Sequence, residues 1–106
     1  MFSIKLNFFA LLLISTLLAG CATSANYEKV VDSWVGSSED ELIRKWGVPT
    51  SSYSTSDNKY ITYRRTRIVD YGSGPFQKSC ETTFTLQNER IVSWSFKGND
   101  CIAFAD

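Results

Sequence analysis

The stretch GSSEDELIRKWGVP, residues 36–49, decides the fold because it contains both the start and the end of one helix. Ser38 followed three residues later by Glu41 is the pattern of a capping box at a helix start. Acidic residues follow the cap and basic residues precede the end, which is the charge order that the helix dipole favours. Gly47 and Pro49 then end the helix. We expect its apolar stripe to face the core: Leu42, Ile43 and Trp46.

A second, shorter helix is predicted just before this stretch, over residues 26–34, with Asn26 as its cap. Four apolar residues recur there at the three- and four-residue spacing of a single helical stripe. A helix this short is stable only when it is packed, so we expect the stripe to lie in the core. Its members are Tyr27, Val30, Val31 and Trp34.

After residue 49 the pattern changes to the alternation of β-strands. Residues 50–56 are either a loop or a short edge strand that turns at Asp57. Residues 59–67 are rich in Tyr, Ile and Thr and predict a strand. One face of it carries Ile61, Tyr63, Arg65 and Arg67, and the other carries Tyr60, Thr62 and Arg64.

Residues 78–86 and 91–97 predict a hairpin with a three-residue loop, after a turn-rich connection at residues 70–75. In that register Cys80 lies opposite Gly98. The apolar sets that then share a face are Cys80, Thr82, Phe84 and Leu86 on one strand and Val92, Trp94 and Phe96 on the other. The expected class is α+β, with two short N-terminal helices packed on one face of a three- to four-stranded antiparallel sheet, in one domain over residues 26–106.

Residues 1–20 have the order of a secretory signal: Lys5, an apolar run, then small residues. The run is about a dozen residues long, whereas a spanning helix needs roughly 20. Cys21 directly follows Leu-Ala-Gly, which resembles the lipobox of bacterial lipoproteins. The resemblance implies cleavage before Cys21, an acylated Cys21 (a diacylglyceryl thioether and an acylated amine), a tether over residues 21–25 and, because Ala22 is not Asp, transfer to the outer membrane. We therefore expect the protein to be lipid-anchored to the outer membrane and to face the periplasm. The alternative is that it faces the exterior of the cell.

The two other cysteines, Cys80 and Cys101, form an even pair in the oxidising compartment that a secretory signal implies. We expect a disulfide between them, because a domain this small needs a covalent staple. Residues 98–100 must then turn back, since bridged Cα atoms lie within about 7 Å.

The stretch 36–49 looks like the signature of the SmpA/OmlA (BamE-like) lipoproteins, in which a capped helix ends in a hydrophobic-Gly-x-Pro turn. Residues 60–63 and 84–91 resemble that family's middle and last strands. The resemblance implies an α+β fold and an accessory role: binding to other subunits of the outer-membrane β-barrel assembly machinery and contact with anionic phospholipid headgroups. The cysteine pair and the three tryptophans depart from that family, so the fold carries over better than the role.

Composition narrows the function classes. The 11 basic and 11 acidic residues balance, which argues against nucleic acid as a partner. The chain has no His to act as a general base, and we expect no enzyme activity, metal site or cofactor. The expected function is a non-enzymatic accessory or envelope-integrity factor that works through contacts with an envelope protein. The alternative is a free-standing binding module, such as an inhibitor of a periplasmic or host enzyme.

The predicted binding surface combines aromatic and basic residues, which are enriched at interface hot spots. Its three arginines also suit lipid phosphates. The alternative is an ordinary solvated edge strand whose charges block edge pairing. The residues are Tyr60, Tyr63, Arg64, Arg65, Arg67 and Tyr71.

Overall fold

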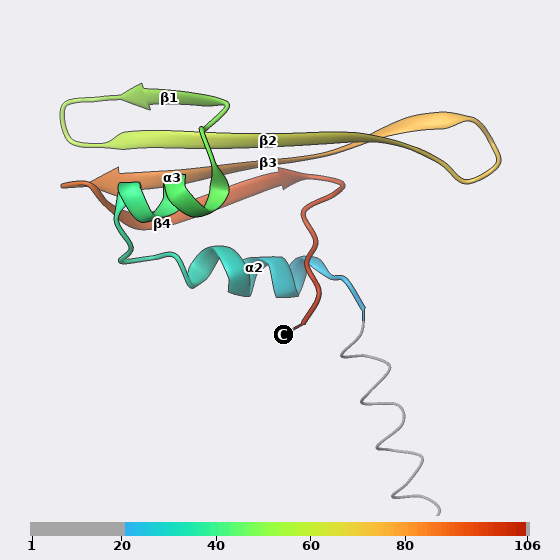
Figure 1. The fold of residues 1–106 in the computed structure, drawn as a ribbon, viewed down its shortest axis with the longest axis horizontal. Helices are drawn as coiled ribbons and strands as arrows, with labels where there is room; N and C mark the ends of the chain where they lie inside the picture. Colours follow the sequence, from blue (N-terminus) through green and yellow to red (C-terminus); the bar gives the residue numbers. More distant parts are fainter. Residues whose placement is uncertain (1–20, 106) are drawn as a thin grey trace, which may run out of the picture.

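The computed structural model describes residues 21–105, so the predicted signal peptide, residues 1–20, and residue 106 lie outside the described residues. The described chain has two helices followed by a four-stranded antiparallel sheet in the order β1-β2-β3-β4 (Figure 1), which confirms the α+β class. With the labels of Figure 1, the elements are α2 (Ser24–Asp32), α3 (Glu39–Trp46), β1 (Ser51–Ser54), β2 (Lys59–Asp70), β3 (Pro75–Gln87) and β4 (Arg90–Gly98).

Helix α3 has the bounds that its punctuation predicts. The Ser38 hydroxyl accepts a hydrogen bond from the Glu41 N–H at 3.1 Å and caps the first turn. Gly47 ends the helix with φ +90°, a conformation that favours glycine. The start of α3 is also attached to the β3–β4 turn, because the Glu39 N–H donates to the Glu89 carbonyl at 2.9 Å.

Helix α2 begins at Ser24 rather than at residue 26, and its cap is Thr23, three residues before the predicted cap Asn26. The Thr23 hydroxyl accepts from the Asn26 N–H at 3.1 Å. Thr23 also exchanges two backbone hydrogen bonds with Ala103, at 2.9 and 3.0 Å, which tie the helix start to the C-terminal segment. The helix ends at Asp32, so Trp34 follows it rather than belonging to it. Of the predicted stripe, Tyr27 and Val31 are buried.

Strand β1 decides between the two interpretations of residues 50–56: it is a short edge strand that pairs with the first four residues of β2. Strands β2 and β3 pair along their whole length, from Lys59↔Leu86 to Asp70↔Pro75. Pairing with β4 ends at Cys80↔Gly98. Residues 66–79 therefore extend past both outer strands as a two-stranded hairpin, here called the arm, which Figure 1 shows projecting to the right.

The β3–β4 turn differs from the predicted three-residue loop. Only Asn88 and Glu89 form it, with φ of 52° and 66°, the backbone twist that suits a two-residue hairpin. A bulge between Thr85 and Leu86 compensates for the shorter loop, so the predicted pairing of Cys80 with Gly98 is confirmed.

The bulge also makes the prediction for Val92 wrong. Ile91, not Val92, lies opposite Leu86 and is buried, whereas Val92 is 42% exposed. Beyond the bulge, Trp94 pairs with Phe84 in the predicted alternation and packs against the core.

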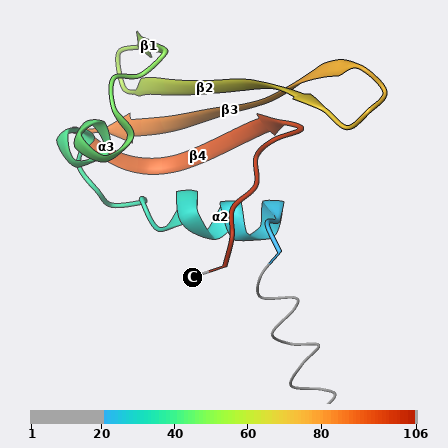
Figure 2. The same cartoon turned by 45° about the vertical axis from the view of Figure 1, so that its right-hand side comes forward.

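The buried apolar cluster contains residues of both helices and of the sheet. The Tyr27 hydroxyl lies 2.7 Å from the Thr82 hydroxyl in a buried hydrogen bond, and the Trp46 ring meets Phe84 edge-on at 5.2 Å. Figure 2 shows α2 running alongside β4. The predicted disulfide is present between Cys80 and Cys101, with Cα atoms 4.9 Å apart. The buried apolar residues are Tyr27, Val31, Leu42, Ile61, Cys80, Phe84, Leu86, Ile91 and Cys101.

In residues 21–105, no helix combines the length and the apolar character needed to cross a membrane.

Candidate functional site

The six residues of the predicted surface do not share one face. Alternation along β2 places Tyr63, Arg65 and Arg67 on the side of the sheet that carries the core, in line with buried Ile61. Tyr60 and Arg64 lie on the other side, and Tyr71 lies in the turn at the end of the arm. The structure therefore separates them. Tyr63 and Arg65 line a cavity beside the helices, Arg67 forms an ion pair at the base of the arm, and Tyr71 lies at the end of the arm, whereas Tyr60 belongs to none of these places.

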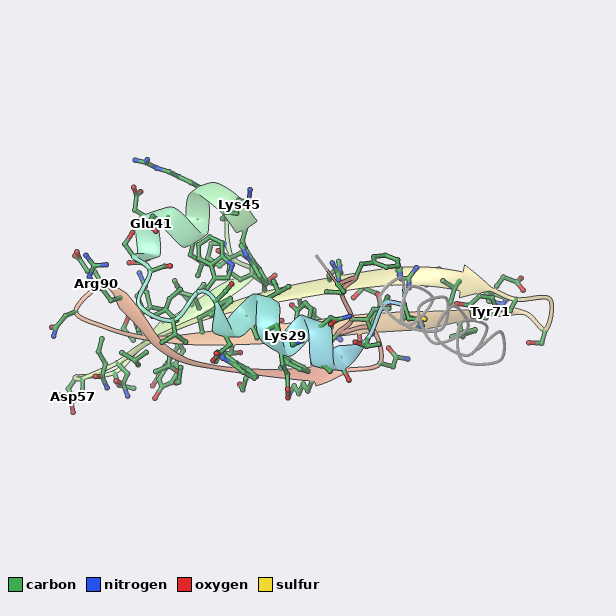
Figure 3. The ribbon with its side chains drawn as sticks, turned by 90° about the horizontal axis from the view of Figure 1, so that it is seen from below. Lys29, Glu41, Lys45, Asp57, Tyr71 and Arg90 are labelled. Atoms are coloured by element: carbon green, nitrogen blue, oxygen red, sulfur yellow. A yellow bond between two sulfur atoms is a disulfide. The ribbon has the colours of Figure 1, made fainter. Side chains whose placement is uncertain are left out.

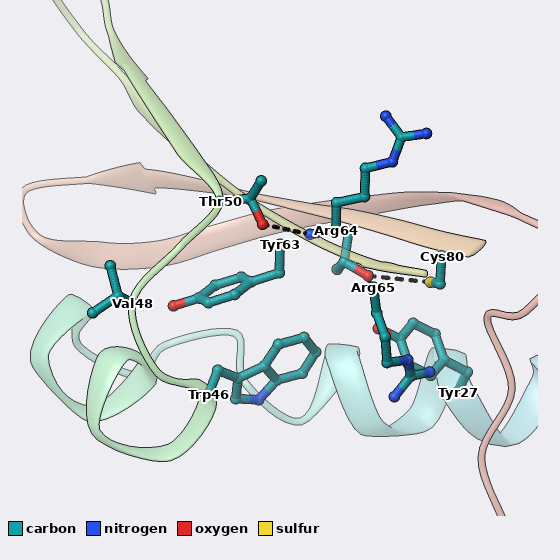
Figure 4. A pocket seen from close by; sticks show the side chains of 9 residues that line it. Tyr27, Trp46, Val48, Thr50, Tyr63, Arg64, Arg65 and Cys80 are labelled. Atoms are coloured by element: carbon teal, nitrogen blue, oxygen red, sulfur yellow. Dashed lines mark hydrogen bonds between the residues drawn. The ribbon is translucent and has the colours of Figure 1, made fainter. Parts of the chain in front are cut away.

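Tyr63 and Arg65 line a cavity of about 320 Å³ where the chain leaves α3 and runs toward β1 (Figure 4). The Tyr63 ring packs against Trp46 with centroids 5.3 Å apart, and its hydroxyl donates to the Gly47 carbonyl at 2.9 Å. Burial, and secondarily the negative charge of Glu39, raise the pKa of Tyr63, so the phenol stays protonated and keeps donating.

Arg65 brings a guanidinium to this cavity. Figure 4 draws its guanidinium among the side chains that line the cavity, and one N–H donates to the Asp100 backbone carbonyl at 3.3 Å. Aromatic walls with one guanidinium can hold an apolar group that ends in an acceptor, such as a carboxylate. The lining residues are Tyr27, Trp46, Val48, Thr50, Tyr63, Arg64, Arg65, Cys80 and Thr82.

Arg67 forms an ion pair with a residue that the sequence analysis missed. Asp100 is only 2% exposed, and Arg67 donates to both of its carboxylate oxygens at 2.8 Å. These hydrogen bonds from Arg67 are the largest cause that lowers the pKa of Asp100, and they raise the pKa of Arg67. Lys78 lies at 4.0 Å and adds to the positive surroundings. The signal was available: Asp100 adjoins Cys101, whose predicted disulfide brings it to the basic strand.

The arm carries exposed apolar side chains. Ile68 is 67% exposed, Tyr71 73% and Phe76 42%. The Tyr71 and Phe76 rings contact each other with centroids 5.6 Å apart. Figure 3 shows Tyr71 at the far end of the arm, and the opposite end of the molecule carries Asp57 and Arg90. Sequence reasoning identified Tyr71 but missed Ile68 and Phe76, because it ended the two strands at residues 67 and 78.

The turn of the arm is held by its own carboxylate. Asp70 Oδ1 accepts hydrogen bonds from the Gly72 N–H at 2.8 Å and the Gly74 N–H at 3.3 Å. The strand pairing of the arm is regular up to Asp70↔Pro75. The arm is therefore an ordered hairpin that presents its apolar side chains on a defined backbone.

The predicted lipidation residue, Cys21, is exposed and lies two residues before the α2 cap. The next residue, Ala22, lines a surface hollow together with Arg65, Arg67, Asp100 and the C-terminal segment. The predicted tether is thus short, because residues 24 and 25 already belong to α2.

Within the described part of the chain, no three His, Cys, Asp or Glu side chains are grouped so that they could hold a metal ion. Comparison with protein-family models, with curated proteins and with solved structures finds no match to this chain.

Proposed function

We propose that this chain is a small lipoprotein, anchored to the bacterial outer membrane, that acts through protein contacts as a non-enzymatic accessory or envelope-integrity factor. The observation that carries the proposal is the arm. A regular hairpin that extends past the sheet exposes Tyr71 and Phe76, whose rings contact each other, and exposes Ile68 on its opposite face. Exposed apolar side chains gathered on one element mark an interaction site. Tyrosine is also enriched at interface hot spots.

The anchor in this proposal is the acylated Cys21, following removal of residues 1–20. Its support is the lipobox in the sequence together with the exposure of Cys21 at the start of the folded domain. Several acyl chains at about 0.8 kcal/mol per buried methylene hold such a domain firmly on a bilayer. Intact-mass analysis of the membrane-extracted protein should show residue 21 at the N-terminus with its acyl chains, and Cys21→Ser should abolish them.

The role in β-barrel assembly, and the finer fold of the SmpA/OmlA-like family, remain part of the proposal. The family pattern requires both helices on one face of the sheet. Two contacts support this arrangement: Tyr27 of α2 bonds Thr82, and Trp46 of α3 packs on Phe84. Thr82 and Phe84 are alternate residues of β3 and so share a face.

Crosslinking in intact cells tests the role. A photoactivatable residue in place of Tyr71 should capture one defined envelope protein at native abundance, whereas the same residue at Val92, another exposed site that lies on β4, should not. Recovery of the lipoprotein alone from both positions would contradict a role based on protein contacts.

The second candidate function, a free-standing inhibitor or binding module, is favoured by the cavity around Arg65 and by the disulfide. The two candidates differ in their need for the anchor. A secreted Cys21→Ser protein should lose the accessory role, because it leaves the membrane surface, but it should keep its affinity if it is an inhibitor. Binding of that protein to a periplasmic hydrolase or to lysozyme would favour the second function.

Anionic headgroups are a further proposed partner, because Arg64 and Arg65 make no ion pair with a carboxylate in the described structure. Each basic residue near an anionic surface contributes about 1 kcal/mol. Retention on phosphatidylglycerol vesicles that falls in the Arg64→Ser, Arg65→Ser variant would support this contact.

A further inference from the structure

We propose that the outer edge of β2 within the arm, at Thr66 and Ile68, binds an extended acidic peptide of a protein partner as an added β-strand. The inference deepens the proposed function, on whose protein-contact role it rests. It assigns the mode of recognition and the chemistry of the partner. Strand addition derives its affinity from main-chain hydrogen bonds at an open sheet edge.

The register of the sheet shows which backbone groups face that edge. The β1–β2 turn is closed by a hydrogen bond from the Thr55 N–H to the Asn58 carbonyl at 2.8 Å. Bonded pairs recur at every second residue of an antiparallel ladder, so the even-numbered residues of β2 direct their N–H and C=O groups toward β1. The Arg64 N–H fits this rule, since it donates to the Thr50 hydroxyl at 2.9 Å.

Beyond Arg64 this edge has no neighbouring strand. Within residues 21–105, β1 is the strand on that side of β2, and its pairing ends at Ser51↔Thr62. The next residues with the same orientation are Thr66 and Ile68. Their backbone groups therefore face outward, with the pairing pattern of a strand and with no strand beside them.

The opposite edge of the arm is closed by the chain itself. The Ser79 N–H donates to the Asn99 side chain at 2.8 Å, and the Ser79 carbonyl accepts from the Asp100 N–H at 3.0 Å. The Asn99 amide also reaches the Gln77 carbonyl at 3.5 Å. Proteins usually protect the exposed edges of their sheets, and here one edge of a single hairpin is covered and the other is left open.

The charges at the base of the arm favour one kind of occupant. The basic residues there outnumber the acidic ones: Arg64, Arg65, Arg67 and Lys78 compared with Asp70, Asp100 and Glu81. Glu81 is in addition paired with Lys97. The base is thus net positive. A second copy of this chain, added edge to edge, would bring its own arginines to the same place, and like charges on neighbouring strands destabilise pairing. A peptide with carboxylates at alternate positions is attracted instead.

The end of the arm specifies the rest of the peptide. Ile68 is 67% exposed beside the open backbone groups and offers apolar contact to an added strand. The inferred partner segment is therefore extended, acidic at the end that lies nearest Arg64 and Arg65, and apolar where it passes Ile68. A capped peptide of alternating glutamate and valine is a suitable probe.

The first test uses Thr66→Pro, with Thr66→Val as the matched control. Proline removes an N–H that faces the open edge and costs no bond to β3, so the sheet should persist. Binding of the probe to the lipid-anchored protein in detergent should fall by about tenfold in Thr66→Pro and stay unchanged in Thr66→Val, because one hydrogen bond is lost and the ring blocks the edge.

A second test uses the wild-type protein and so does not depend on the folding of a variant. The probe is methylated on every second amide nitrogen, in each of the two alternating phases. One phase should abolish binding and the other should preserve it, because only alternate amides of an added strand face the edge. A lysine–valine probe should not bind.

Equal binding of the two methylated probes, or equal binding by Thr66→Pro and Thr66→Val, would overturn the proposal. A third result would also overturn it: the protein binds anionic vesicles equally well with and without Thr66→Pro, and the peptide does not bind. The occupant would then be a lipid surface. A partner crosslinked through Tyr71 regardless of Thr66→Pro would preserve the protein-contact role and reject strand addition. Peptide binding without any crosslinked partner in cells would preserve strand addition and reject the protein-contact role.

Discussion

At the scale of single residues, Asp100 connects three parts of the molecule. Its side chain is buried against Arg67 of β2, its N–H is bonded to Ser79 of β3, and it adjoins the disulfide at Cys101. A buried carboxylate is stable only when it is paired and hydrogen-bonded. Asp100 therefore fixes the C-terminal segment against the base of the arm.

Replacing Asp100 by Asn should lower the free energy of unfolding by about 2 kcal/mol, because the two charge-assisted hydrogen bonds from Arg67 become weaker. Urea unfolding of the variant and the wild type measures the difference. Asp57→Asn, on an exposed turn at the other end of the molecule, is the control and should change little.

The same carboxylate predicts a pH dependence. The pKa of Asp100 in the folded state lies below its ordinary value of 3.8, chiefly through hydrogen bonds from Arg67. A depressed folded pKa means that the stabilisation is complete above the unfolded value and is lost as the pH falls through the folded value. The gap in stability between the wild type and Asp100→Asn should thus be constant near neutral pH and shrink below about pH 3.8. A gap that widened on acidification would contradict the assignment.

Tyr27 and Thr82 form the polar contact inside the core. Tyr27→Phe leaves the Thr82 hydroxyl with only the Cys80 sulfur at 3.6 Å and should cost about 1 kcal/mol. Thr82→Val alone strands the phenol in the same way. The double variant removes both partners and leaves no polar group unpaired. Its loss of unfolding free energy should therefore be smaller than the sum of the losses in the two single variants. Strict additivity would show that the hydrogen bond does not form.

At the scale of elements, the end of β4 must approach β3 without a side chain between them. A Cβ on Gly98 would lie 2.2 Å from the Ser79 carbonyl oxygen, and its φ of +129° strains any other residue. This contact places Asn99 and Asp100 along the arm. The closed edge of the arm therefore depends on a glycine at position 98.

Gly98→Ala should destabilise the domain by about 2 kcal/mol more than Gly72→Ala. Both glycines have positive φ, but a Cβ on Gly72 meets nothing within 4 Å, so the difference isolates the clash with β3. Thermal unfolding of the two variants measures it. Equal losses would mean that the close approach of β4 to β3 carries no energetic weight.

How much of these elements the sequence predicts depends on how locally each is encoded. Helix α3 carries its cap and its closing glycine, and it was predicted at its observed bounds. The face of β3 that ends in Cys80 was also predicted correctly, since strict alternation has only one interpretation. The start of α2 was misplaced because Thr23 is a cap that is held by a distant partner, Ala103.

The errors in the hairpin and the site have a non-local origin. A bulge at Leu86 restores the register after a shorter loop, and nothing in the local sequence of Val92 marks it as the displaced residue. One strand was predicted to end at Arg67 and the next to begin at Lys78, so the paired residues between them were missed. The structure shows that paired strands continue past them, since Asp100 takes up their charge. The candidate site was therefore predicted by residue type and not by arrangement.

At the scale of the whole molecule, the disulfide holds the C-terminal segment beside the sheet. It closes a loop with a sequence separation of 21 residues, and its loss should cost about 3 kcal/mol on the chain-entropy model. The double variant Cys80→Ala, Cys101→Ala tests this by urea unfolding under oxidising conditions. Its stability should match that of the reduced wild type. A variant as stable as the oxidised wild type would show that core packing alone holds the segment.

The two ends of the elongated sheet have different roles in this account. The end with Asp57 and Arg90 is polar and is held by the start of α3. The other end carries the arm, one edge of which is covered by residues 99–100 and the other open. The proposed partner site and the proposed lipid anchor belong to one small domain. The anchor therefore limits the arm to partners that lie near the membrane surface.

The most direct measurement of the central claim is photocrosslinking in intact cells from a reactive residue at position 71 in the arm, with and without Thr66→Pro. The account predicts one crosslinked envelope protein, joined through an extended acidic segment, that disappears with Thr66→Pro and persists with Thr66→Val. A crosslink that survives Thr66→Pro, or no crosslinked protein in any variant, would contradict it.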